Sequence, residues 1–379
     1  MSLFYLVAGE PSGDRLGASL MRGLKHLAPE STFAGVGGPL MRAEGLASLF
    51  DYRDLAVMGI AEVLPRLPQL VARIRETAND CLERRPAALI GIDAPSFALR
   101  VSERVRRRDP RIRTIHYVAP SVWAWRPGRA AHMARFTDHV LALLPFEPPY
   151  MQAAGMTCDF VGHPIAETKA LPKAEIAATR ARLGGDRPLL AVAPGSRRSE
   201  IARMAPLFTE TLARLRTQIP DLACVLPLSD AVAGALPESL AQGATLVRPE
   251  DGEHAKRLAF GAADAALVKS GTISLEMAAA DTPHIVTYQT SWLTAAIVRR
   301  LVRIDTANLV NLVSESRTVP EYLQERATPK ALAAAVSGLL EDANTRAAQR
   351  RVFDQVLQTL GRGGEAPSLR AARSVLAQV

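Results

Sequence analysis

The stretch Pro188 to Glu200, PLLAVAPGSRRSE, decides the fold. Leu189 to Ala193 are apolar and predict a short buried strand, which Pro194-Gly195-Ser196 end. The polar residues that follow predict the start of a helix that continues to Leu215. A strand, a tight loop and a helix in succession are typical of a βα unit. Because this unit begins in mid-chain, we expect a second α/β domain to start here.

The loop in this stretch has the chemistry of an anion site. Backbone N–H groups at a helix N-terminus, here those around Gly195 and Ser196, favour a negative charge, as does the helix dipole. Arg197 and Arg198 add fixed positive charge with bidentate geometry. The predicted ligand is a phosphate or diphosphate. The alternative is a plain strand-to-helix turn with surface arginines.

Length and composition indicate an ordinary globular protein. The 379 residues suffice for two domains, and the apolar and charged fractions are average. The uncharged start MSLFYLVAGE reads as a strand rather than a signal peptide, and no apolar run reaches the length of a membrane span. We therefore expect a cytoplasmic location. Cys81, Cys158 and Cys224 lack metal-site spacing and are expected to be buried thiols.

The net charge of +8 indicates an attraction to anionic partners. Nucleic acid is disfavoured, because zinc-finger spacing, an RNP-type motif and a basic tail are all missing and only 5% of residues are aromatic. Ser291 to Ile304 predicts a helix with Arg299, Arg300 and Arg303 opposite an apolar side. Such a helix suits peripheral binding to an anionic membrane. The alternative is an ordinary surface helix.

Two series of βα units organise the chain. The expected strands are Phe4 to Ala8, Thr32 to Gly38, Ala87 to Ile92, Thr114 to Val118 and His139 to Leu144, then Leu189 to Ala193, Ala223 to Pro227, Thr245 to Val247, Ala265 to Val268 and Pro283 to Tyr288. We predict two Rossmann-like domains, 1–165 and 166–349, facing across a cleft, with a helix at about 350–379 that packs back on the first. Ligands of such parallel sheets bind at the carboxyl ends of the strands.

Three loops of the second half should therefore contribute to one site. The first contains Gly195 to Arg198, the second is Ser270-Gly271-Thr272, and the third is Asn308 to Asn311. Glu276, one turn into a helix, could accept hydrogen bonds from ribose hydroxyls. Each signal alone is weak, but together they favour a nucleotide diphosphate. No Walker sequence and no G-x-G-x-x-G after a strand occurs, which excludes a P-loop and disfavours a dinucleotide fold.

Seven motifs along the chain resemble lipid-A-disaccharide synthase. They are AGEPSGD (8–14), GIDAPSF (91–97), HYVAPSVWAWR (116–126), LPFE (144–147), GHP (162–164), PGSRRSE (194–200) and SGTISLE (270–276). One departure is visible: the family usually has Pro-Asn-Leu where this chain has Leu309-Val310-Asn311-Leu312. The loop around Asn311 is therefore expected to differ slightly in shape.

The resemblance implies an inverting glycosyltransferase of the GT-B type in lipid A biosynthesis. It implies that the chain joins UDP-2,3-diacylglucosamine to 2,3-diacylglucosamine 1-phosphate and releases UDP. No metal or other cofactor is implied, in keeping with the lack of an Asp-x-Asp motif. Separately from the resemblance, we expect a peripheral position on the inner face of the cytoplasmic membrane, and a homodimer is left open.

The resemblance and the loop chemistry together assign roles to named residues. The expected catalytic residues are Asp93, as general base, and Arg197, on the leaving diphosphate. The expected UDP-binding residues are Gly195, Ser196, Arg198, Ser270, Gly271, Thr272, Glu276 and Asn311. The expected acceptor or cleft residues are Ser12, Gly13, Asp14, Ser121, Trp123 and Arg126.

Several alternatives stay open at this point. Asp14 rivals Asp93 as the base, and Asp93 could instead cap the helix that follows it. Trp123 could be a packing residue rather than part of an acceptor surface. A UDP-sugar epimerase of the same fold and a non-catalytic nucleotide-sugar binder are the alternative functions, since fold alone does not decide activity.

Overall fold

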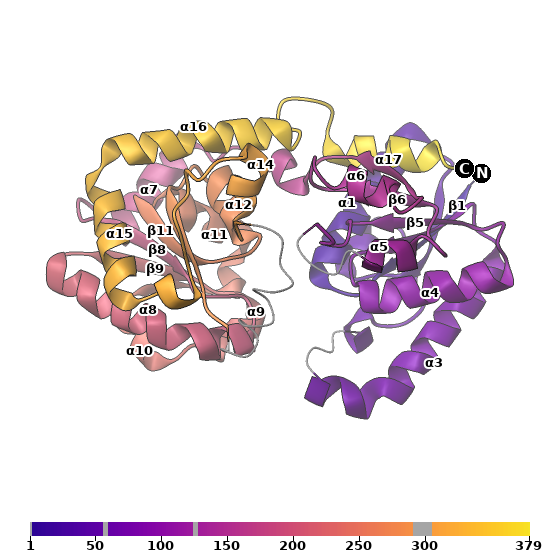
Figure 1. Ribbon diagram of the computed structural model, residues 1–379, viewed down its shortest axis with the longest axis horizontal. Helices are drawn as coiled ribbons and strands as arrows, with labels where there is room; N and C mark the ends of the chain where they lie inside the picture. The colour runs from indigo at the N-terminus through magenta and orange to yellow at the C-terminus, as the bar shows by residue number, and fades with distance from the viewer. Residues whose placement is uncertain (1, 56–59, 124–127, 291–304) are drawn as a thin grey trace. The chain divides into compact units, whose positions relative to one another are not determined.

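The computed structural model describes residues 2–55, 60–123, 128–290 and 305–379 (Figure 1). The chain divides into two compact units. The first contains Met1–Glu167 and Leu360–Val379, and the second contains Thr168–Thr359. The sequence-based division placed these boundaries at 165 and about 350. Both ends of the chain therefore belong to the first unit.

The first unit is a parallel sheet covered by helices, with strand order β3-β2-β1-β4-β5-β6-β7. The strands are β1 Leu3–Ala8, β2 Thr32–Val36, β3 Ala47–Ser48, β4 Ala88–Ile92, β5 Arg113–Tyr117, β6 His139–Ala142 and β7 Thr157–Phe160. The helices are α1 Pro11–Leu27, α2 Pro39–Ala43, α3 Ile60–Arg84, α4 Pro95–Arg108, α5 Gly128–Met133, α6 Pro148–Gln152 and α17 Pro367–Leu376, with 3-10 turns η1 Tyr52–Leu55 and η2 Pro164–Glu167.

The central strands of this sheet are apolar on both faces. In β1, Phe4 and Leu6 pack into one core while Tyr5 and Val7 pack into another, and all four are at most 1% exposed. Parallel strands buried on both faces read as continuous apolar runs, which is why they were visible in the sequence. The result is a rigid sheet that holds the loops at its carboxyl edge.

The end of the chain completes the first unit. α17 packs beside α1 (Figure 1). A Cβ on Gly23 of α1 would lie 2.5 Å from the carbonyl oxygen of Ser368, so the two helices approach closely because this residue is glycine. Ser374 of α17 also donates to Asp159 and contacts His139 Nε2, which ties the helix to β7 and β6.

The second unit is also a parallel sheet with helices, in the order β10-β9-β8-β11-β12-β13. The strands are β8 Leu189–Ala193, β9 Ala223–Pro227, β10 Thr245–Val247, β11 Ala265–Lys269, β12 His284–Tyr288 and β13 Glu321–Leu323. The helices are α7 Lys173–Leu183, α8 Arg198–Gln218, α9 Asp230–Ala233, α10 Glu238–Ala241, α11 Gly252–Gly261, α12 Ile273–Ala279, α14 Leu309–Ser314, α15 Pro329–Glu341 and α16 Ala343–Thr359, with 3-10 turns η3 Pro249–Asp251 and η4 Gln324–Arg326.

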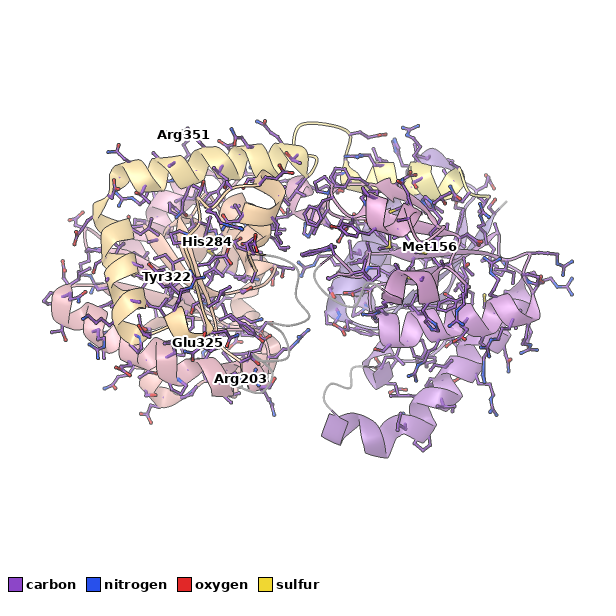
Figure 2. All side chains as sticks on the ribbon, in the orientation of Figure 1. Met156, Arg203, His284, Tyr322, Glu325 and Arg351 are labelled. Carbon is purple, nitrogen blue, oxygen red and sulfur yellow. The ribbon has the colours of Figure 1, made fainter. Side chains whose placement is uncertain are left out.

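Helices cover this second sheet through apolar and polar contacts. α8 packs against α15, and their buried side chains share one core with β8 and β11. His284 of β12, labelled in Figure 2, stacks on Phe353 of α16 with ring centroids 5.3 Å apart. Gln349 bonds both the N–H and the carbonyl of His284, at 2.8 and 3.2 Å. These contacts attach α16 to strand β12.

The two-domain α/β fold expected from the sequence is confirmed, with differences in short elements. β3, β7 and β13 were not predicted, because β3 has only two residues and the sequences of β7 (TCDF) and β13 (EYL) mix charged and apolar residues. The segment from Asn308 to Asn311, expected to be a loop, is the N-cap and first turn of α14. Cys81, Cys158 and Cys224 are free and buried, as expected.

Within the part of the chain that the structure describes, none of the helices is long and apolar enough to span a membrane.

The strand orders locate a topological switch point in each unit. In the first, the chain builds outward from β1 through β2 to β3 and then returns to place β4 on the other side of β1. In the second, β9 and β10 lie on one side of β8 and β11 lies on the other. Loops that leave adjacent strands in opposite directions open a crevice, and ligands of doubly wound sheets bind there.

Candidate active site

The loops at the switch point of the second unit form a pocket of about 340 Å³. It lies entirely within this unit and unites four loop regions that are distant in sequence. Its lining residues are Ala193, Gly195, Ser196, Arg197, Glu200, Pro227, Leu228, Ser229, Glu253, Lys256, Phe260, Lys269, Ser270, Gly271, Thr272, Ile273 and Glu276. The predicted phosphate loop and the predicted SGT loop are thus brought together.

The loop after β8 is shaped by one glycine and one glutamate. Gly195 has φ 147°, and a Cβ there would lie 2.8 Å from Cβ of Glu200, so only glycine fits. Arg197 is the N-cap of α8 and its side chain is 54% exposed. Ser229, after β9, donates to the carbonyl of Ser196 at 3.2 Å. The loop is therefore contacted by Glu200 of α8 and by Ser229, which follows β9.

A buried ion pair links this loop to the end of β11. Lys269 Nζ lies 2.8 Å from Glu200 Oε1, and both side chains are at most 17% exposed. The other carboxylate oxygen of Glu200 accepts from the N–H of Ser196 at 3.0 Å. Burial alone would raise the pKa of Glu200, but the hydrogen bond and charge of Lys269 lower it below its ordinary value. Glu200 is therefore ionised at neutral pH.

A second ion pair lines the same pocket. Lys256 of α11 is 2.8 Å from Glu276 of α12 and 3.5 Å from Glu253. Burial lowers the pKa of Lys256, but the two carboxylates outweigh this effect and raise it. The carboxylate of Glu276 is fixed in the pocket by this pair, with Phe260 providing apolar wall beside it.

Two predicted UDP-binding residues lie elsewhere. Asn311 is 1% exposed, and its amide group bonds Val319 N and O and Glu321 Oε1. Glu321 also accepts from Ala307 N, and Ala307 O accepts from Ser270 Oγ at 2.7 Å. Asn311 thus supports the SGT loop through intermediates. Asn311 and Arg198 are thus the two predicted UDP-binding residues that are not among the described residues lining the pocket.

The switch point of the first unit carries a carboxylate on a strained turn. Asp93 and Ala94, directly after β4, have φ 50° and 38°, a conformation uncommon for non-glycine residues. Such outliers cluster at functional sites. Ser12, at the start of α1, donates to Asp93 Oδ2 at 3.1 Å and so joins the loops after β1 and β4. Asp93 does not cap α4: its N-cap is Ala94, for which no side-chain cap is found.

Asp14 has a structural role instead. Its side chain is 2% exposed and accepts from the N–H groups of Gly38, Leu40 and Met41 at 2.9 to 3.0 Å. These groups are the free donors at the start of α2, so Asp14 caps that helix from α1. Both oxygens of the Asp14 carboxylate are therefore occupied by backbone donors. Gly13 is buried and a Cβ there would lie 3.3 Å from the carbonyl of Ile92.

Comparison with known proteins identifies the family. The family described as Lipid-A-disaccharide synthetase matches residues 4–373. The chain belongs to the lipid-A-disaccharide synthase family. Curated relatives of that name include one from Ruegeria pomeroyi, 50% identical over 98% of this chain and 94% of the relative. Another, from Rhodospirillum centenum, is 46% identical over 99% of this chain and 94% of its own length.

Solved structures with the same fold are more distant. The UDP-GlcNAc 2-epimerase from Neisseria meningitidis bound to UDP-GlcNAc has a TM-score of 0.64 at 12% identity, covering 100% of this chain and 99% of the epimerase. UGT89C1 from Arabidopsis thaliana has a TM-score of 0.62 at 13% identity, covering 99% of this chain and 98% of its own. At such identities only the fold is shown. It is the family match that favours lipid-A-disaccharide synthase over an epimerase.

The tryptophan motif of this synthase family is tied to a buried glutamate. Trp123 is half-buried, donates to Glu147 Oε1 at 3.3 Å, and packs edge-to-face on Phe146 with centroids 5.0 Å apart. Glu147 also accepts from the N–H groups of Leu143 and Leu144. Burial raises the pKa of Glu147 to about 7, although these donors favour the carboxylate.

The structure gives less information on two other acceptor candidates, Ser121 and Arg126. Ser121 is exposed, and Arg126 lies outside the described residues, as does the predicted membrane helix Ser291 to Ile304.

The sequence analysis missed four residues with clear roles in these sites: Glu147, Glu200, Lys256 and Lys269. Glu147 and Glu200 stand inside the quoted motifs LPFE and PGSRRSE, so the family resemblance offered a signal for them. Lys256 and Lys269 act through partners 20 and 69 residues away, as the spacings to Glu276 and Glu200 show. Among the described residues, no group of three or more His, Cys, Asp and Glu could hold a metal ion.

Proposed function

We propose that the chain is an inverting glycosyltransferase that joins UDP-2,3-diacylglucosamine to 2,3-diacylglucosamine 1-phosphate and releases UDP. The observation that carries the proposal is the family match over residues 4–373. The pocket at the switch point of the second unit supports it, because cationic side chains, the loop around Gly195 and Ser196 and the carboxylate of Glu276 all line it. Those are the groups that a nucleoside diphosphate requires.

In this proposal the donor's UDP part occupies the pocket of the second unit. Arg197, Lys269 and the N–H groups of the Gly195-Ser196 turn face the diphosphate, while Gly271 and Thr272 contact it from the other loop. Glu276, held by Lys256, accepts from the ribose hydroxyls. Asn311 and Ser270 keep the second loop in place. As the glycosidic bond breaks, charge grows on the β-phosphate and Arg197 stabilises it.

Asp93 acts as the general base on the acceptor. It takes the proton of the acceptor's primary hydroxyl while that oxygen bonds the anomeric carbon from the face opposite the diphosphate. The bond from the anomeric carbon to the diphosphate oxygen breaks with its electron pair, so UDP leaves and the configuration inverts. Ser12 orients the Asp93 carboxylate by its hydrogen bond. Ser121, Trp123 and Arg126 are proposed acceptor contacts.

The test is UDP release with both purified lipid sugars. The transferase produces UDP only when donor and acceptor are both present, together with a disaccharide 1-phosphate. An epimerase would convert the donor alone into its stereoisomer, and a binder would retain UDP affinity without product. Release of UDP that does not depend on the acceptor would contradict the proposed reaction.

We also propose that an anionic membrane surface is a partner. Ser291 to Ile304 was predicted for this role from its sequence. A described surface has related chemistry: a groove between α3 and α4 that exposed Val71 lines, with exposed Leu67 one turn away on α3. The groove contains two carboxylates, Glu83 and Glu103, and a larger number of arginines. Its arginines are Arg75, Arg85, Arg100, Arg104, Arg107 and Arg108. Cationic side chains beside exposed aliphatic ones favour an anionic bilayer.

Co-sedimentation with vesicles containing anionic lipid tests both surfaces. The double variant Arg75→Glu with Arg100→Glu and the triple variant Arg299→Glu, Arg300→Glu and Arg303→Glu should each reduce sedimentation. The matched control is Arg214→Glu with Arg351→Glu, two exposed arginines of the second unit. A surface whose variant sediments like the control is not the membrane contact.

A further inference from the structure

The Glu200 carboxylate accepts hydrogen bonds from donors in and beside the predicted phosphate loop. One oxygen accepts from the N–H of Ser196 at 3.0 Å, and the other lies 2.8 Å from Lys269 Nζ. The guanidinium of Arg197 is 3.9 Å from the same second oxygen. A backbone N–H, an ammonium and a guanidinium thus converge on one internal anion.

These are the groups that a diphosphate would need in the same pocket. Glu200, Ser196, Arg197 and Lys269 all line it, together with the open Gly271 turn, where the nearest atom to an added Cβ is Lys269 Nζ at 3.9 Å. Because Glu200 is ionised, its charge opposes that of a phosphate over a short distance in a half-buried site. The two anions cannot both hold the same donors.

The position of Glu200 goes beyond ordinary helix capping. A glutamate at the third position of a helix usually bonds the N–H of the N-cap residue, which here is Arg197. Glu200 instead reaches the residue before it, Ser196, and pairs with a lysine at the end of another strand. Its side chain also lies against the bare Cα of Gly195. The carboxylate therefore lies over the anion-binding face of the loop.

We propose that Glu200 is a built-in competitor of the donor diphosphate, an inference that rests on the proposed function of this pocket. Binding of the diphosphate moves the carboxylate off Ser196 N–H and Lys269, and those two groups turn to the phosphates. The return of the carboxylate then helps to expel UDP after transfer. Glu200 accordingly lowers affinity for UDP and speeds its release, while leaving recognition of the nucleoside unaffected.

Calorimetric titration of Glu200→Gln with UDP and with uridine tests this. Glutamine keeps the size and one acceptor but removes the charge, so UDP should bind about tenfold more tightly than to the wild type. Uridine affinity should be unchanged, which also reports that the pocket is folded. Glu210→Gln, an exposed glutamate of the same helix with the same charge change, is the matched control and should leave both affinities unchanged.

Lys269→Met provides the second measurement. In the double variant with Glu200→Gln, the gain in UDP affinity should shrink, because the lysine released by the glutamate is no longer there to bind phosphate. Stopped-flow displacement of UDP should show slower dissociation from Glu200→Gln.

The possible outcomes separate this inference from the proposed function. UDP binding to Glu200→Gln that is weaker than or equal to that of the wild type, with uridine unchanged, would show that Glu200 only shapes the loop, and would overturn the competitor role. If the wild type bound neither UDP nor uridine, the donor pocket itself would be wrong and both proposals would fail. If Glu200→Gln does not fold, Glu200→Asp, whose shorter side chain weakens the contacts, should show the same gain in a smaller amount.

Discussion

The loop after β1 in the first unit and the loop after β8 in the second start from the same pattern and end in different chemistry. Each stretch runs from a buried strand into a helix and contains Gly, Pro and Ser close to the helix start, and each helix carries an acidic residue in its first turns. Asp14 points into the fold and caps α2, whereas Glu200 turns back over its own loop to Lys269. What lies next to the loop decides the role of the carboxylate.

The two switch points also differ in charge. In the first unit, Asp93 lies beside the neutral hydroxyl of Ser12. In the second, Arg197 and Lys269 line the pocket. A carboxylate beside a hydroxyl suits proton transfer, and paired cations suit a diphosphate. These differences support the proposed division, with the general base in the first unit and anion binding in the second.

The largest effect is expected for Asp93→Asn. The amide keeps the size and most hydrogen bonds but cannot take a proton, so turnover should fall roughly 10²- to 10⁴-fold. UDP affinity and thermal stability should stay near wild-type values, as measured by calorimetry and thermal unfolding. Wild-type turnover in this variant would contradict the role of Asp93 as the general base, and with it the proposed division of roles between the two units.

A smaller loss is expected for Arg197→Ala on the other side of the comparison. A guanidinium that meets charge developing on the leaving diphosphate should contribute on the order of 10²-fold to turnover. The loss in kcat should exceed the loss in UDP affinity. Arg198→Ala is the natural comparison, since Arg198 is the adjacent arginine of the same motif. Equal losses in rate and affinity would make Arg197 a binding residue only.

Asp14→Ala should change stability rather than chemistry. It would leave the N–H groups of Gly38, Leu40 and Met41 without their acceptor, which should cost about 3 kcal/mol of unfolding free energy. Denaturant unfolding measures this cost. Activity should decline in step with the folded fraction. A stable variant with lost turnover would instead place Asp14 beside Asp93 in the reaction.

The last prediction concerns pH and the buried Glu147. Between its ordinary pKa of 4.5 and about 7, the folded protein keeps a proton on Glu147 that the unfolded chain releases. The stabilising contribution is complete below pH 4.5 and is lost as pH rises to about 7, at up to about 1.4 kcal/mol per pH unit. Glu147→Gln should flatten this slope in denaturant titrations between pH 5 and 8. An unchanged slope would contradict the raised pKa.

The sequence by itself determined the strands β1, β4, β8, β9 and β11, the turn between β8 and α8, and the family. Those conclusions depend on local patterns: apolar runs of four or five residues, glycine at a turn, and motifs within about ten residues. Local chemistry also pointed to Asp93, because a carboxylate directly after a buried strand has to lie at the sheet edge. β3, with two residues, is too short to give any pattern.

Only the tertiary structure decided which elements became neighbours. Strand order set the two switch points, and no local pattern states that β4 lies beside β1 or β11 beside β8. Glu200 meets Lys269 across 69 residues, and Asp14 meets the start of α2 across 24 to 27. Asn311 was expected to bind UDP, but its side chain is buried and its amide donates hydrogen bonds to Val319 and Glu321. The role of a polar side chain depends on the partner that packing brings next to it. In these cases the partner is distant in the sequence, so a local pattern cannot identify it.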